Sequence, residues 1–85
     1  MFSYVRTLAS KSQILEDAGY SYSFDRMLYV NREAKKAFSV EFVEDHSEDQ
    51  LQERIQEGNG TGEWRFYFNS PPSDSVRREL VSVLE

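Results

Sequence analysis

The stretch that decides the predicted fold reads Glu63-Trp64-Arg65-Phe66-Tyr67-Phe68-Asn69. Its side chains alternate, so that Trp64, Phe66 and Phe68 fall on one side of an extended chain and Arg65 and Tyr67 on the other. Strict alternation of this kind is typical of a half-buried β-strand. Three large aromatic residues on one face make it the strongest predicted core strand, against which we expect helices to pack.

A β-hairpin is predicted upstream of this strand. Residues 20–30 are expected to form its first strand, with a bulge or small bend at residues 25–26. Residues 37–43 alternate again and are expected to form its second strand. The intervening residues 31–36 are polar and charged, which suits a hairpin loop.

Three helices are predicted around these strands. The first covers residues 4–18 and ends at Gly19, although a start near residue 11 and an edge strand over residues 1–5 also fit. The second begins at Ser47, whose spacing to Gln50 is that of a capping box. The third follows Ser70-Pro71-Pro72-Ser73, and its expected buried stripe is Val76, Leu80, Val83 and Leu84.

These elements predict a single α+β domain over residues 1–85, in the order α-β-β-α-β-α. We expect a small three-stranded sheet with helices packed mainly on one face. The other face would then be open and would show Arg65 and Tyr67. We expect a monomer at micromolar concentration, with this open face as a site for weak self-association or for a partner.

Composition narrows the class of protein. The net charge is −5, and residues 41–57 hold seven carboxylates against Arg54 alone, whereas the remaining residues hold eight acidic and nine basic side chains.

The lack of cysteine excludes disulfides and favours a cytoplasmic location. No apolar run approaches the ~20 residues that span a bilayer, so no membrane attachment is expected. Met1 suggests a complete chain, and residues 1–6 lack the pattern of a signal peptide.

The acidic segment supplies the leading functional hypothesis. Asp49, Glu53 and Glu57 lie opposite the apolar stripe of the second predicted helix and would attract a partner with a basic surface. Together with Arg65 and Tyr67 they form the candidate protein-binding residues of an accessory or regulatory module. One version is an inhibitor or immunity-type protein that mimics the polyanionic substrate of a nuclease. Simple solvation of the helix face is the commoner role of such carboxylates.

The alternative hypothesis is nucleic-acid binding through Arg32, Lys35 and Lys36 of the hairpin loop, together with the outer sheet face. An acidic protein with a pI near 4.8 lacks the electrostatic footprint of a polyanion binder, which makes this hypothesis the weaker one.

Motifs for catalysis or cofactors give no third hypothesis. His46 is the single histidine, and the carboxylates next to it in sequence are expected to diverge in space, so we predict no metal site. The glycines of residues 58–62 lead into a strand and lack the following lysine of a phosphate loop. We therefore expect neither an enzyme nor a cofactor.

Overall fold

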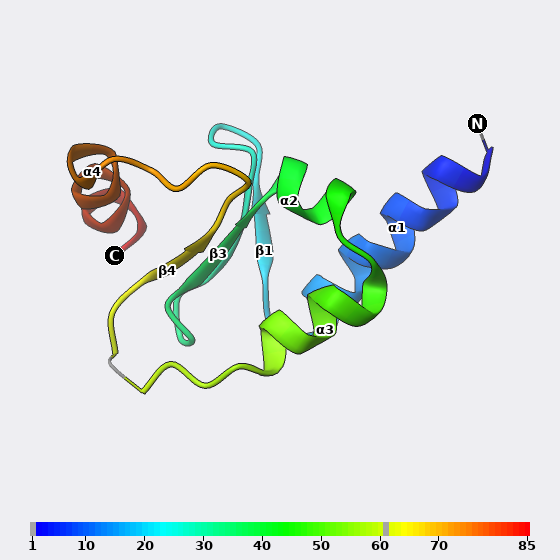
Figure 1. Cartoon of the computed structure of the whole chain (residues 1–85), viewed down its shortest axis with the longest axis horizontal. Helices are drawn as coiled ribbons and strands as arrows, with labels where there is room; N and C mark the ends of the chain where they lie inside the picture. Colours follow the sequence, from blue (N-terminus) through cyan, green and yellow to red (C-terminus); the bar gives the residue numbers. More distant parts are fainter. Residues whose placement is uncertain (1, 61) are drawn as a thin grey trace.

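A computed structural model of the chain describes the backbone of residues 2–60 and 62–85 and the side chains of residues 10–60 and 62–85. Within these ranges it has four helices and four strands (Figure 1). The helices are α1 (Phe2–Asp17), α2 (Val40–Asp45), α3 (Glu48–Gln56) and α4 (Asp74–Leu84). The strands are β1 (Ser21–Ser23), β2 (Leu28–Asn31), β3 (Lys36–Ser39) and β4 (Arg65–Tyr67). None of the described helices is long and apolar enough to cross a membrane.

The strands form one mixed sheet in the order β1-β2-β3-β4. The pairs β1–β2 and β2–β3 are antiparallel, and β3–β4 is parallel. The predicted α+β class is therefore confirmed, but the three-stranded sheet is wrong. Residues 24–27 form a tight turn that divides the predicted strand 20–30 into β1 and β2, because Met27 adopts a left-handed backbone conformation with φ of 54°.

One row of aromatic side chains crosses the whole sheet. The register places Tyr22 opposite Tyr29, Tyr29 opposite Phe38, and Phe38 opposite Tyr67. The Phe38 and Tyr67 rings are stacked with their centroids 4.5 Å apart. These side chains pack against α1, α2 and α3, whose buried contributions to this core are Leu15, Phe42, Val43 and Leu51.

The opposite face of the sheet is also apolar. Ala37 lies opposite Phe66, and both belong to a second core with Val30, Trp64 and Leu84 of α4. Figure 1 shows α4 and the group α1–α3 on opposite sides of the sheet. Three of the four described helices pack on one face of the sheet, but the predicted open face is wrong, because the second face is also apolar and α4 covers it.

Two local predictions are also corrected. The predicted strand 37–43 stops at Ser39, whose side chain accepts a hydrogen bond of 3.1 Å from the backbone N–H of Phe42 and starts α2. Near the N-terminus α1 begins at Phe2, so the edge strand proposed for residues 1–5 is wrong for residues 2–5, while Met1 lies outside the described residues.

Phe38 is expected to dominate the stability of the fold. It is fully buried at the centre of the first core, so Phe38→Ala should lower the free energy of unfolding by about 3–5 kcal/mol. The matched control is Phe24→Ala in the β1–β2 turn, where the side chain is 84% exposed and the change should stay within about 0.5 kcal/mol. Urea denaturation of both variants measures the difference. Equal losses would contradict the described core.

Tyr20 offers a stabilising substitution. Its hydroxyl is buried without a hydrogen-bond partner among the described residues, so Tyr20→Phe should raise the free energy of unfolding by about 1 kcal/mol. Burial also raises the pKa of the Tyr20 hydroxyl, with a smaller contribution from Tyr67. Because the pKa is raised in the fold, the hydroxyl ionises more readily in the unfolded chain, so the free energy of unfolding does not change with this group below the ordinary tyrosine pKa of about 10 and falls as the pH rises above it. Tyr20→Phe should therefore weaken the alkaline loss of stability, as denaturation at pH values from about 8 to 11 would show.

Candidate functional site

Five polar side chains meet where the end of α3 approaches the sheet. We name them the Glu57 cluster: Lys36, Arg54, Glu57, Arg65 and Tyr67. The Tyr67 hydroxyl donates a hydrogen bond of 2.9 Å to Glu57 Oε2, and Arg65 Nη1 lies 3.7 Å from the same oxygen. Arg54 forms an ion pair with the other carboxylate oxygen. Glu57 therefore ties α3 to β4 and does not belong to the outer acidic face of the helix.

Lys36 of β3 supports this cluster from inside the fold. Its side chain is only 2% exposed, and Nζ donates hydrogen bonds to the carbonyl oxygens of Arg54, Ile55 and Glu57 at the end of α3. These carbonyls lack partners within the helix, so the ammonium group closes the helix C-terminus. Burial lowers the pKa of Lys36, and the nearby Glu57 carboxylate opposes that shift.

The other two bases of the predicted nucleic-acid site also hold the fold. Arg32 Nε donates a hydrogen bond of 2.7 Å to the carbonyl oxygen of Leu84, which ends α4. Lys35 Nζ lies 3.9 Å from a carboxylate oxygen of Glu85. The structure therefore brings Arg32, Lys35 and Lys36 to helix ends, rather than presenting them as one exposed basic patch.

The predicted protein-binding residues fall into two groups. Asp49 and Glu53 are exposed on α3, where Glu53 Oε2 lies 3.8 Å from Arg54 Nη2. Glu57, Arg65 and Tyr67 meet in the Glu57 cluster. Tyr67 does not face solvent as expected for an outer sheet face, because its ring is half-buried between Phe38 and Phe42.

His46 has a local role at the end of α2. Its ring stacks on Phe42 with centroids 3.8 Å apart, and Nδ1 lies 2.8 Å from the Phe42 carbonyl oxygen. Among residues 2–60 and 62–85 no three or more histidine, aspartate or glutamate side chains converge as a metal site would require. The contacts of His46 are those of a side chain that packs against its own helix.

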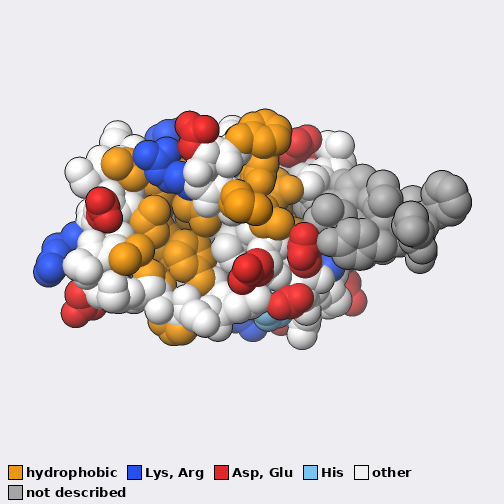
Figure 2. All heavy atoms as spheres, turned by 90° about the horizontal axis from the view of Figure 1, so that it is seen from above, with side chains coloured by type: hydrophobic (Ala, Val, Ile, Leu, Met, Phe, Trp, Pro, Cys, Tyr) orange, Lys and Arg blue, Asp and Glu red, His pale blue; other side chains and the backbone are white. Residues whose placement is uncertain are grey.

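A second feature, which the sequence reasoning missed, is an exposed apolar face. Among the described side chains, the large hydrophobic residues most exposed to solvent are Phe24 at 84% and Met27 at 58% in the β1–β2 turn, and Val76 at 43% and Val83 at 47% on α4. Seen from above the view of Figure 1, hydrophobic side chains gather on one face, with acidic and basic side chains at its margin (Figure 2). The predicted burial of Val76 and Val83 is therefore wrong, because Leu84 and the half-buried Val81 are the residues of α4 that pack on the sheet with Leu80.

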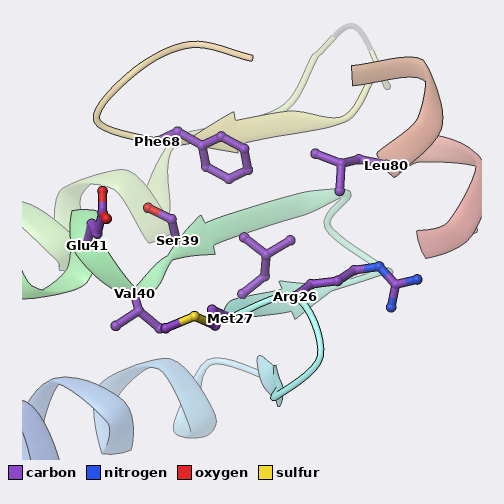
Figure 3. Close-up of a pocket in the computed structure, with 8 residues that line it drawn as sticks. Arg26, Met27, Ser39, Val40, Glu41, Phe68 and Leu80 are labelled. Atoms are coloured by element: carbon purple, nitrogen blue, oxygen red, sulfur yellow. The ribbon is translucent and has the colours of Figure 1, made fainter. Parts of the chain in front are cut away.

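This face contains a hollow of about 260 Å³, which we name the apolar groove. Its lining side chains come from four parts of the chain and are Arg26, Met27, Leu28, Ser39, Val40, Glu41, Phe68 and Leu80. In Figure 3 the side chains of Phe68 and Leu80 point toward one another across the groove, Met27 lies against Val40, and the guanidinium group of Arg26 points away. Apart from the polar groups at its rim, the groove offers a largely apolar surface.

Met27 is held at the groove in an unfavourable backbone conformation. Its φ of 54° is in the left-handed region, which costs an ordinary side chain about 1–2 kcal/mol. Glycine or asparagine would be favoured there. The sequence signal available was the turn Phe24-Asp25-Arg26-Met27, in which two large apolar residues flank two charged ones.

The Glu57 cluster predicts a difference between two acidic residues of the same segment. Glu57→Lys should lower the free energy of unfolding by about 1–3 kcal/mol, because it breaks the contacts to Tyr67, Arg54 and Arg65 and places a cation beside Lys36. Glu53→Lys makes the same change of net charge at an exposed site of α3 and should leave the urea midpoint nearly unchanged. If both variants unfold at the same urea concentration as the parent chain, Glu57 is not a structural contact.

Comparisons of the chain with protein families, with curated proteins and with solved structures find no match. What the chain binds is therefore inferred from its own surfaces. Two of them combine side chains from separate elements: the Glu57 cluster, which is engaged in holding the fold, and the apolar groove, which faces solvent.

Proposed function

We propose that this chain is a protein-binding module that binds its partner through the apolar groove and the exposed apolar side chains around it. The observation that carries the proposal is the β1–β2 turn, where the exposed Met27 side chain lines an apolar hollow and Phe24 of the same turn is 84% exposed. Contiguous exposed apolar surface on a small domain is typical of an interaction site.

The backbone of Met27 strengthens this proposal. Selection for stability alone favours glycine or asparagine where the backbone is left-handed, yet the chain has methionine there with its side chain at the groove. Strain that the rest of the fold must compensate is often found at functional positions. Methionine is also flexible and polarisable, which suits a surface that must adapt to a partner.

The acidic residues take a supporting role in this proposal. Asp49 and Glu53 are exposed on α3, and the net charge of −5 favours approach of a basic partner. Long-range attraction of this kind raises the association rate more than the final affinity. We therefore expect the chain to act as an accessory, regulatory or inhibitor-like protein in the cytoplasm.

Binding is preferred over catalysis because the reactive side chains have structural contacts. His46 contacts Phe42, Tyr67 contacts Glu57, and Lys36 contacts the end of α3.

Nucleic-acid binding is not favoured by the contacts of Arg32, Lys35 and Lys36, since a phosphate would have to compete with partners within the fold.

The double substitution Phe24→Ser with Met27→Asn tests the proposal. Both side chains are exposed, and asparagine tolerates the left-handed backbone, so the free energy of unfolding should stay the same or rise by up to about 1 kcal/mol. Proteins retained from a cell extract by the parent chain should be lost, and a purified partner should dissociate faster.

The comparison variant is Asp49→Asn with Glu53→Gln on α3. It should slow association and weaken its salt dependence, while the dissociation rate stays close to that of the parent chain. If the turn variant binds like the parent chain and the α3 variant loses its partner, the acidic face is the binding site and the groove proposal is wrong.

A further inference from the structure

Three apolar residues of α4 have the spacing of a helix contact. Val76, Leu80 and Val83 are four and three residues apart, so they form one stripe along α4. Val76 and Val83 are exposed, whereas Leu80 between them is half-buried and also packs on the second core with Val81 and Leu84. Apolar stripes with this spacing are what two helices use when they pack side by side.

Leu80 also lies between two hollows. It lines the apolar groove, and it lines a second hollow of about 250 Å³ together with Arg26, Val76, Glu79 and Val83. A ridge with a hollow on each side is the shape that receives the side chains of a second helix. An extended segment that added to the sheet would instead need a free strand edge along the hollow, and the α4 side of both hollows is helix surface.

The charged residues at the two hollows indicate whether the partner surface should be basic or acidic. Glu41 lines the apolar groove, Glu79 lines the second hollow and Arg26 lines both, with its guanidinium group pointing away from the groove in Figure 3. Beyond Glu41, the rest of the acidic segment 41–57 continues over α2 and α3. Basic side chains flanking an apolar stripe would therefore meet carboxylates at both hollows.

A second copy of the chain fits this surface less well. The stripe is centred on Leu80, so a two-fold axis through it would place two α4 helices antiparallel, with Glu79 of one copy near Glu79 of the other. Like charges at that position oppose pairing, as does the net charge of −5 on each copy.

We propose that the apolar groove and the α4 stripe take a cationic amphipathic helix of another protein, laid along Val76, Leu80 and Val83 with its basic residues at Glu79 and Glu41. The inference rests on the proposed function and adds to it the secondary structure and charge of the bound segment. Helix-in-groove recognition uses apolar anchors one turn apart, which is the spacing that this surface presents.

Three synthetic peptides of about 15 residues test the inference, a length at which an isolated helix is marginal and binding can induce it. The first is an amphipathic leucine–lysine helix, the second has the same composition in scrambled order, and the third replaces lysine by glutamate. Titration of isotope-labelled protein by NMR should shift the signals of Met27, Val40, Phe68 and the α4 stripe with the first peptide. The other two should bind at least about tenfold more weakly, and circular dichroism should show helix gained by the first on binding.

A pair of charge reversals provides the matched control. Glu79→Lys and Glu53→Lys change the net charge equally, but of the two residues only Glu79 lines the second hollow, next to the α4 stripe. Glu79→Lys should weaken binding of the leucine–lysine peptide about fivefold and strengthen binding of the glutamate peptide, whereas Glu53→Lys should change neither by more than about twofold. Equal effects of the two reversals would show that attraction is general and not located at the groove.

The outcomes separate this inference from the proposed function. If the scrambled peptide shifts the groove signals as strongly as the ordered one, the helical occupant is wrong while groove binding stands. Equal binding of the glutamate peptide would overturn the cationic partner. Shifts confined to α3 around Asp49 and Glu53 would overturn both proposals, and concentration-dependent dimerisation through the α4 stripe would replace the second protein by a second copy.

Discussion

The register between β3 and β4 is the constraint on which the rest of this structure depends. Phe38 lies opposite Tyr67, and Ala37 lies opposite Phe66, so the aromatic residues of β4 are divided between the two faces of the sheet. A shift of one residue would reverse every side chain of the strand. With the observed register neither face can be left to water, and each must be covered by helices.

The two faces of the sheet are covered by different numbers of helices, and the groove lies on the side with less cover. Three helices pack on the face that carries Phe38, whereas α4 alone packs on the face that carries Trp64. Polar contacts fix the orientation of α4: Arg77 Nη2 donates a hydrogen bond of 2.6 Å to the Trp64 carbonyl oxygen, and Arg32 contacts the carbonyl oxygen of Leu84. With its two ends held in this way, α4 directs Val81 and Leu84 inward and leaves the Val76 side of its apolar surface outside.

The sequence predicted the elements better than their packing. Alternation located β4, the Ser47 capping box located α3, and the glycine after α1 located its end. The segment from Phe38 to Phe42 shows why packing is harder. Residues four apart share a helix face and residues two apart share a strand face, so Phe38 and Phe42 fit both patterns, while Val40 between them fits the strand pattern. The strand gives way to a helix after Ser39, because the Ser39 side chain caps the N-terminus of α2.

The candidate site was less predictable than the fold, for two physical reasons. Glu57 was predicted on the outer face of a helix, but it is the C-cap residue that follows α3, and its backbone carbonyl and side chain contact Lys36 and Tyr67. These contacts depend on where the helix end meets the sheet, which no local pattern encodes. The groove depends on a left-handed methionine, and nothing in the residue preference of methionine predicts that conformation.

The acidic surface follows from the way the fold uses its basic residues. Lys11 donates to the Glu44 carbonyl oxygen of α2, Lys36 to the end of α3, and Arg32 to the end of α4, so long cationic side chains close three helix C-termini. Cations used in this way are engaged at the negative ends of helix dipoles, and Lys11 and Lys36 are buried there, while the carboxylates of Asp49 and Glu53 stay in water. The negative field at the surface is thus partly a consequence of helix capping and carries little information on a partner's shape. We expect shape selectivity to come from the apolar groove and the adjoining α4 hollow, because these surfaces offer a partner defined hollows together with apolar area to remove from water.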